Sequence, residues 1–285
     1  MRNTRTLTLL PLLLALCLCG GAMAAELKVN KVNGAKEELI YSILELAISK
    51  VDPETKPKQL KDELPLGRLA KAVENNTIDI MWAGSSADYD NRLLAIRIPL
   101  LKGLLGHRVF IIKPENQPKF DSVKTLEDLA KLKAGLNSRW GSTRVLKNAG
   151  LDVVESTSYE NLFHMLDSGR FDYYSRAVHE PWVELQDRPE LNLAIEKNIL
   201  IIYPYAMHFY VKKNNKPLKD FIEKGLEMAI ADGSFDELFF NNPMIKKAIE
   251  DTGFQRRTII RIPNPFLHPD TPLQRKELWL DVEKL

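Results

Sequence analysis

The chain has 285 residues, and its content of 45% hydrophobic and 27% charged residues is typical of a globular protein. The 40 lysines and arginines nearly balance the 38 acidic residues. No excess of positive charge is therefore available to neutralise a polyanion, and nucleic acid is not an expected partner. The two cysteines are too few for a disulfide framework or for the four ligands of a structural zinc site.

The first two dozen residues have the pattern of a secretory signal peptide. A start with two arginines precedes an apolar run from Leu7 to Cys19, and Ala22-Met23-Ala24 is a small-x-small cleavage site. The run is shorter than the roughly 20 residues needed to cross a bilayer. We therefore expect a cleaved signal peptide over residues 1–24, and the alternative is a retained N-terminal anchor.

Removal of this signal peptide also removes Cys17, Cys19 and two arginines, which leaves equal numbers of basic and acidic side chains. Each cysteine follows a leucine, whereas a lipoprotein signal needs a small residue before its cysteine. An exported protein without cysteines is typical of a bacterial periplasm and needs a core that is stable without disulfides. We expect a periplasmic protein.

The N-terminal part of the mature chain alternates strands and helices. The patterns predict a strand over 27–32, helices over 37–50 and 66–73, and a buried strand over 78–82 that ends in a polar loop over 83–90. This alternation is typical of an α/β protein with largely parallel strands.

The alternation continues around a break that contains Pro114 and Pro118. The expected elements are strands at 109–112, 134–137, 153–154, 171–174 and 208–211, and helices from 126, from 141 to Gly150, at 158–166 and at 217–230. The last 32 residues, from Phe254, hold four prolines and are expected to wrap over a domain surface.

Motifs for catalysis and cofactor binding are missing from the sequence. There is no G-x-S-x-G and no P-loop motif. No metal-binding spacing is found among the five histidines, His107, His164, His179, His208 and His268. We therefore expect no metal, no cofactor and no enzymatic activity.

Three polar turns follow predicted strands, at the position where open α/β sheets bind ligands. At the first turn, Ser85 and Ser86 follow the strand that ends at Trp82, and Arg92 lies downstream. Trp82, and Trp140 beside the second turn, are either stacking surfaces for a ligand or core residues. Each arginine is either a ligand contact or a member of a surface ion pair.

The second turn, Gly141-Ser142-Thr143-Arg144, opens a helix. Free backbone N–H groups and adjacent hydroxyls at such a turn suit a carboxylate or a phosphate, and Arg144 adds a bidentate partner. The alternative is that Ser142 only caps the helix.

The third turn contains Arg176 and Glu180 after the strand that ends at Tyr174. Glu180 either accepts a hydrogen bond from a ligand amine or caps the next helix.

Taken together, these segments resemble family 3 of the bacterial extracellular solute-binding proteins, the type II periplasmic binding proteins of amino-acid ABC transporters. The resemblance rests on residues 79–92, 126–129, 141–143, 169–172, 208–213 and 217–233. It covers nearly all of residues 26–253.

The resemblance implies a two-lobed α/β fold with a cleft between the lobes and two hinge-crossing strands. Residues 26–112 and 208–285 are expected to form lobe one, and residues 113–207 to form lobe two. Closure of the lobes around a solute is the expected motion.

In the amino-acid binders of this family, the ligand carboxylate is held by side chains that match Ser85, Ser86, Arg92, Ser142 and Thr143. The acid that binds the α-amine is missing, because Ala177 stands near its position. The resemblance therefore implies either an anionic solute near Arg92, Arg144 and Arg176, or Glu180 as a substitute partner for the amine.

We expect a non-enzymatic monomer that passes a small polar solute to an inner-membrane ABC permease or a sensor. One alternative is a dehydratase-like enzyme on the same fold, in which Glu180 or His179 faces Ser142 as acid and base. The other is a scaffold or sensor domain that no longer binds a ligand.

Overall fold

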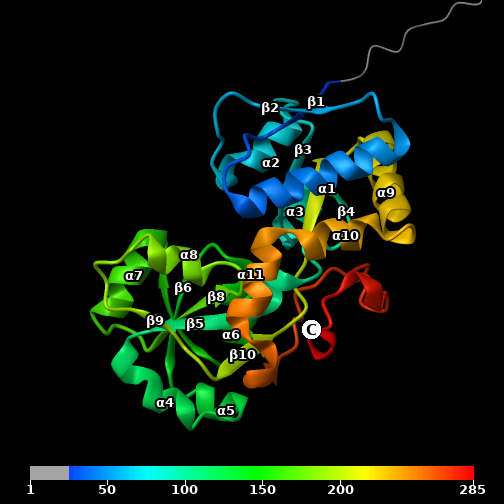
Figure 1. Cartoon of the computed structure of the whole chain (residues 1–285). Helices are drawn as coiled ribbons and strands as arrows, with labels where there is room; N and C mark the ends of the chain where they lie inside the picture. Colours follow the sequence, from blue (N-terminus) through cyan, green and yellow to red (C-terminus); the bar gives the residue numbers. More distant parts are fainter. Residues whose placement is uncertain (1–25) are drawn as a thin grey trace, which may run out of the picture.

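The chain forms two β-sheets, each packed against its own helices, in the computed structural model, which describes residues 26–285 (Figure 1). The first sheet has the order β2-β1-β3-β11-β4. Its strands are β1 (Leu27–Val29), β2 (Pro57–Gln59), β3 (Ile80–Gly84), β4 (Leu93–Ile96) and β11 (Met207–Lys212). The second sheet has the order β12-β10-β5-β8-β6-β7, and β9 also pairs with β5. Its strands are β5 (His107–Ile112), β6 (Lys133–Asn137), β7 (Asp152–Ser156), β8 (Tyr173–Ala177), β9 (Ala194–Ile195), β10 (Ile199–Ile202) and β12 (Thr258–Arg261).

The helices divide between the two sheets. Those that pack with the first sheet are α1 (Ala35–Val51), α2 (Leu66–Glu74), α3 (Ala87–Arg92), α9 (Lys216–Ala231), α10 (Ser234–Asn241) and α11 (Pro243–Thr252). Those that pack with the second sheet are α4 (Gln117–Asp121), α5 (Leu126–Leu129), α6 (Gly141–Asn148), α7 (Tyr159–Asp167) and α8 (Pro181–Gln186). Within residues 26–285, no helix has both the length and the apolar character needed to span a membrane.

Helix α1 confirms the helix predicted over 37–50. All six apolar positions of its predicted stripe are buried: Leu39, Ile40, Ile43, Leu44, Ala47 and Ile48. The stripe packs against α9 so closely that a Cβ on Gly225 would lie 1.9 Å from the carbonyl oxygen of Ala47. Only glycine allows this approach of the two helix backbones.

Most of the other predicted elements are present, and two expectations are wrong. The segment expected to be a loop over 83–90 contains the start of α3, because the side chain of Ser86 accepts a hydrogen bond from Tyr89 N and begins a helix. The strands are not largely parallel: β11 is antiparallel to β3 and β4, and β5 is antiparallel to β8, β9 and β10. Both strands follow a segment that crosses between the sheets, so they enter their sheets in the opposite direction.

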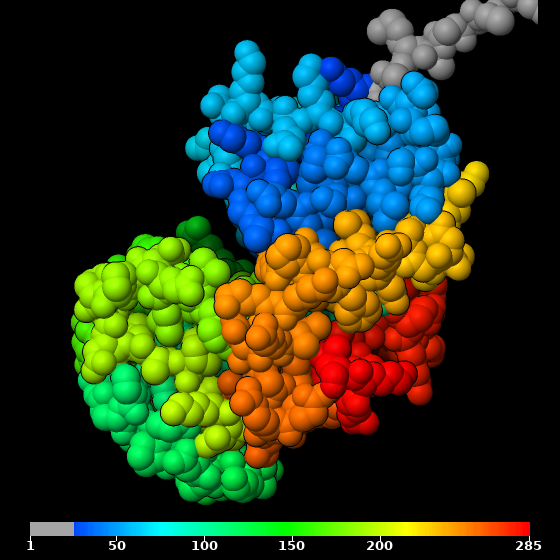
Figure 2. All heavy atoms as spheres, in the orientation of Figure 1, coloured from blue at the N-terminus to red at the C-terminus, as the bar shows by residue number. Residues whose placement is uncertain are grey.

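Two short segments, 97–106 and 203–206, connect the two sheets directly, whereas the expected crossings were two strands near residues 112 and 208. The C-terminal part connects them a third time. It runs from α11 into β12, which pairs in parallel with β10, and then returns to the core of the first sheet, where Leu278, Leu280 and Val282 are buried. Figure 2 shows this orange and red segment beside both parts of the molecule.

The sheets therefore do not follow the expected boundaries. Residues 107–112 and 258–261 were expected in lobe one, but β5 and β12 belong to the second sheet. The tail was expected only to cover a surface, whereas it contributes a strand and six buried core residues, Phe254, Ile260, Ile262, Leu278, Leu280 and Val282. Its return is fixed by the hydrogen bond from Leu280 N to Lys102 O, 2.8 Å, and by the ion pair of Arg275 with Glu227. The predicted signal peptide, with Cys17 and Cys19, lies outside the described residues.

Candidate functional site

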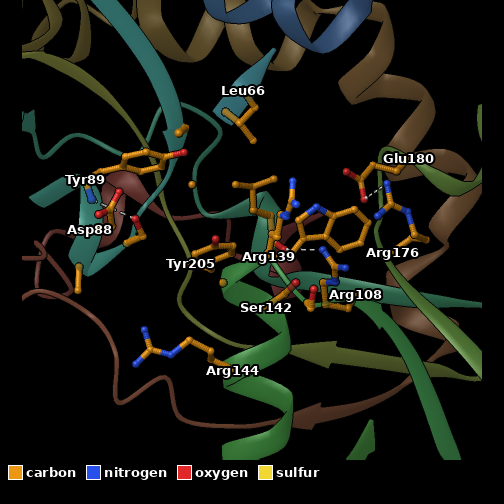
Figure 3. A pocket seen from close by; sticks show the side chains of 18 of the residues that line it. Leu66, Asp88, Tyr89, Arg108, Arg139, Ser142, Arg144, Arg176, Glu180 and Tyr205 are labelled. Atoms are coloured by element: carbon orange, nitrogen blue, oxygen red, sulfur yellow. Dashed lines mark hydrogen bonds and ion pairs between the residues drawn. The ribbon is translucent and has the colours of Figure 1, made fainter. Parts of the chain in front are cut away.

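A cavity of about 520 Å³ lies at the junction of the two sheets (Figure 3). Its volume is in the range of sites that bind small molecules. The wall nearer the first sheet is formed by Lys36, Leu66, Ala83, Gly84, Ser86, Ala87, Asp88 and Tyr89. The wall nearer the second sheet is formed by Arg108, Ser138, Arg139, Trp140, Gly141, Ser142, Arg144, Arg176 and Glu180. Leu105 and Tyr205, from the two crossing segments, complete the lining.

The two walls are built from the ends of strands. On one side, β3 ends at Gly84 and leads into α3, whose N-cap is Ser86. On the other side, β6 leads through Trp140 into the first turn of α6, where Ser142 is 3% exposed. Ligand sites in α/β proteins occur at such strand ends, so the fold brings two of them to one cavity.

Tyr205 lies between the walls. A Cβ on Gly84 would be 2.6 Å from its hydroxyl oxygen, and a Cβ on Gly141 would be 2.5 Å from it. Both glycines are therefore needed for the position of this side chain, which Figure 3 shows in the middle of the cavity. Tyr205 thereby links the end of β3 to the start of α6.

Arg176, on β8, is a buried and fully paired cation. Its Nε donates to both carboxylate oxygens of Glu184, at 3.0 and 2.8 Å, its Nη2 also donates to Glu184, and Glu180 lies 3.0 Å from Nη2. The guanidinium also stacks on the ring of Trp140 at 4.7 Å. Burial lowers the pKa of Arg176, but the two carboxylates outweigh that effect and raise it.

Glu180 and His179 are held in defined charge states by the same surroundings. Burial raises the pKa of Glu180, but Arg176 and other nearby cations outweigh it, so the pKa is lowered and the carboxylate is charged. Its Oε2 accepts a hydrogen bond from Ala177 N at 2.8 Å. Burial lowers the pKa of His179 to about 4, which keeps the ring neutral at pH 7.

Arg108, at the start of β5, is buried but not paired with a carboxylate. It is 4% exposed. Its guanidinium donates to Ser175 O at 2.6 Å, to Ser175 Oγ at 3.3 Å and to Leu105 O at 3.3 Å. No carboxylate among residues 26–285 lies within ion-pair distance of it. The charge of Arg108 nevertheless acts on Glu180, since it is one of the charges that lower the pKa of that carboxylate.

Two further arginines line the cavity from the start of α6. Arg139 and Arg144 are exposed, and neither has an ion-pair partner within the described part of the chain. The guanidinium of Arg144 lies 4.3 Å from the centre of the ring of Phe266. Lys36, on the opposite wall, pairs with Glu37 at 2.8 Å.

The structure brings together six of the ten predicted site residues: Ser86, Trp140, Ser142, Arg144, Arg176 and Glu180 line the cavity. The suggestion that Ser142 only caps its helix is wrong, since Trp140 is the N-cap of α6 and has no capping side-chain bond. Glu180 does occupy the N-cap position of α8, but its side chain does not cap that helix.

The other four predicted residues do not line the cavity. Arg92 is held away by Glu74 at 2.7 Å and by Asp88 at 3.1 Å. Trp82 donates its indole N–H to Glu37 and is 7% exposed. Ser85 N donates a hydrogen bond to Ala206 O, and Thr143 Oγ1 donates one to Asn137 O. Both residues therefore bind backbone carbonyl groups of the protein itself.

Arg108, Arg139, Lys36 and Tyr205 line the cavity and were not predicted as site residues. One signal in the sequence pointed to Arg108, because a charged residue at the start of the apolar run Val109-Phe110-Ile111-Ile112 is unusual in a buried strand. Tyr205 has no comparable signal, since its place depends on two glycines that are distant in the sequence.

Within residues 26–285, no group of three or more histidine, cysteine, aspartate or glutamate side chains comes together in a way that could hold a metal ion. His107 and His208 are buried, and burial lowers their pKa values to about 4 and about 3. Neither histidine lines the cavity, and His179 does not line it either.

No protein-family model matches the chain, and no curated protein matches its sequence. Solved structures do match. An ancestral arginine-binding protein bound to arginine is 21% identical, with a TM-score of 0.51 over 72% of this chain and 87% of that chain. The amino-acid ABC transporter substrate-binding protein AbpA from Streptococcus pneumoniae, bound to L-arginine, is 16% identical, with a TM-score of 0.51 over 73% and 84% of the chains.

A third match is ytmK from Bacillus subtilis, a probable amino-acid ABC transporter extracellular-binding protein. It is 17% identical, with a TM-score of 0.53 over 73% of this chain and 88% of that chain. At these identities the likeness concerns the fold alone. The expected fold class is confirmed: the chain has the two-lobed α/β fold of the type II periplasmic binding proteins.

Proposed function

We propose that this protein captures a small polar solute in the cavity between the two sheets and delivers it to an ABC permease or a sensor. The observation that carries the proposal is the cavity itself, which both sheets and both crossing segments line with polar and charged side chains. We propose further that the two sheets with their helices are the two lobes, and that the mature protein acts in the periplasm.

The fold supports the proposal, since the similar structures include substrate-binding proteins of amino-acid ABC transporters. The predicted signal peptide agrees with a periplasmic location. A binding protein needs a site that a solute can occupy rather than a catalytic group, and the cavity between the two sheets is such a site.

The mechanism follows from the arrangement of the walls. A solute that contacts both Ser86 on one wall and Ser142 on the other makes its full set of contacts only when the walls are close together. Such a ligand binds the closed form more tightly and shifts the population toward it. The crossing segments 97–106 and 203–206 are the natural hinges for this motion.

The geometry does not favour an enzyme. Glu180, the suggested acid or base, is held as a charged carboxylate by Arg176 and by Ala177 N. His179 does not line the cavity. Within residues 26–285, Glu180 and His179 therefore do not form an acid and base pair facing Ser142.

Thermal unfolding of residues 26–285 in the presence of amino acids, carboxylates and short peptides tests the proposal. Binding to the folded state alone stabilises a protein by RT ln(1 + [L]/Kd), so the melting temperature is expected to rise with the concentration of a cognate solute. A melting temperature that no small solute changes would favour the alternative of a scaffold that has lost ligand binding.

A further inference from the structure

We infer that the solute is a small organic carboxylate that carries no obligatory amine, and that Arg108 is its principal charged contact. This inference rests on the proposed function, because it assigns the chemical class of the ligand that the same cavity binds. It differs from the assignment made by resemblance, which placed the carboxylate on Arg92.

The charge of the cavity wall points to an anion. Among residues 26–285, five cationic side chains line the cavity, against two carboxylates, Asp88 and Glu180. Both carboxylates are already engaged, Asp88 by Arg92 at 3.1 Å and Glu180 by Arg176 at 3.0 Å. A ligand ammonium group would therefore compete with an arginine for Asp88 or for Glu180. A ligand carboxylate, in contrast, can bind Arg108, Arg139 or Arg144, which have no acidic partner among residues 26–285.

Arg108 is the cation with the greatest need of such a partner. It is 4% exposed, and all its hydrogen bonds go to neutral oxygens of Leu105 and Ser175. Burial of a charge without a counter-charge is costly, so an anion bound beside it recovers more free energy than one bound at a solvated arginine. Oxygen atoms of a carboxylate also match the planar guanidinium geometry.

The surroundings of Arg108 supply the rest of an anion site. Ser142, 3% exposed, presents its hydroxyl from the first turn of α6, the end of the helix dipole that attracts negative charge. Figure 3 shows Arg108, Arg139 and Ser142 on the same side of the cavity, opposite Asp88 and Tyr89. The anionic end of the ligand therefore faces the second sheet.

The experiment measures thermal stabilisation of residues 26–285 by named probes at constant ionic strength. Succinate and glutarate represent carboxylates without an amine, L-glutamine and L-arginine represent amino acids, and phosphate and sulfate represent inorganic oxyanions. The protein variants are Arg108→Met, Arg108→Lys and, as a matched control, Arg92→Gln, since Arg92 does not line the cavity.

We expect a carboxylate to raise the melting temperature of the unmodified protein and of Arg92→Gln. In Arg108→Met the apparent Kd is expected to rise about tenfold or more, as for the loss of a charge-assisted hydrogen bond, and Arg108→Lys is expected to fall between the two. Circular dichroism without ligand checks that each variant is folded. If Arg108→Met does not fold, the affinity of Arg108→Lys is compared with that of the unmodified protein instead.

Three results would overturn the inference. Stronger stabilisation by L-glutamine or L-arginine than by every carboxylate would refute the absence of an amine site while leaving the proposed function intact. Stronger stabilisation by phosphate or sulfate would refute the organic carboxylate, and undiminished binding by Arg108→Met would refute the role of Arg108. No effect of any probe on the unmodified protein would refute the proposed function itself.

Discussion

Two buried arginines lie on neighbouring strands of the second sheet, and their surroundings are opposite in character. Arg108 begins β5 and Arg176 is near the end of β8, where Val109 pairs with Arg176 and Arg108 pairs with Ala177. Their exposed fractions are almost equal, 4% and 5%. Arg176 is paired with Glu184 and Glu180, whereas Arg108 has no carboxylate partner in the described part of the chain.

The pleat of the sheet explains this difference. Successive side chains of a strand point to opposite faces, so Arg108 shares a face with Phe110 and Arg176 shares the other face with Tyr174. Helix α8, which carries Glu184, packs on the face of Arg176. On the face that Arg108 shares with Phe110, the apolar residues Val145 and Leu146 of α6 pack against the sheet, and no carboxylate of residues 26–285 lies within ion-pair distance of Arg108.

This comparison assigns the two arginines different roles. A buried cation with two built-in acids is already neutralised, and removal of the cation alone destabilises the fold because it leaves the acids unpaired. A buried cation without an acid is compensated only when a ligand supplies the negative charge. Stability and ligand binding, measured for variants at each arginine, separate these roles.

The largest effect on stability is expected from Arg176→Met. The substitution leaves Glu184 and Glu180 without their cation, and loss of one partner of a buried ion pair costs about 3–5 kcal/mol. Urea denaturation measures the loss. The double variant Arg176→Met/Glu184→Gln is expected to recover part of it, because one stranded charge is removed. Equal stability of both variants would contradict the paired role of Arg176.

A smaller effect is expected from His179, which both arginines influence. Burial lowers its pKa to about 4, with Arg176 and Arg108 acting in the same direction and Glu180 opposing them. Because this folded-state value is below the ordinary 6.5, the stability that the neutral ring provides is complete above pH 6.5 and is lost as the pH falls toward 4.

His179→Gln removes this dependence on pH. The free energy of unfolding of each protein is measured at pH 7.5 and at pH 5. Between these two pH values it is expected to fall by about 1–2 kcal/mol less in the variant than in the unmodified protein. The other buried histidines remain in both proteins, so their contributions cancel. Identical pH profiles from denaturant titrations would show that His179 is not held neutral by its surroundings.

A still smaller effect on stability is expected from Arg108→Met without ligand. The variant loses hydrogen bonds to neutral oxygens but also removes an unpaired buried charge, so the free energy of unfolding is expected to change by less than about 1 kcal/mol. Urea denaturation beside Arg176→Met measures the contrast. A loss as large as that of Arg176→Met would remove the distinction between the two arginines.

The smallest effect is expected from Arg92→Gln. Its ion pairs with Glu74 and Asp88 are partly exposed, and such pairs contribute about 0.5 kcal/mol or less. Solute binding is expected to be unchanged, as measured by the thermal shift of the same probes. Lost binding in this variant would restore Arg92 to the site, in agreement with the family resemblance.

Local patterns were sufficient to predict much of this molecule. The stripe of α1 follows the helical period, and Ser86 and Ser142 were found because they follow strands. Arg176 was expected in a turn after its strand but lies within β8. The strand order that places β5 beside β8 and β10 was not predicted, because pairings between distant segments leave no local signal. Arg108 and Tyr205 enter the cavity through those pairings, so their roles could not be read from the sequence.

Titration calorimetry of succinate and glutarate into residues 26–285 and into Arg108→Met measures directly whether a carboxylate binds at Arg108. We expect saturable binding at one site in the unmodified protein and an affinity about tenfold or more weaker in the variant, with both proteins equally folded. Equal affinity in the two proteins, or no binding of either carboxylate to the unmodified protein, would contradict this expectation.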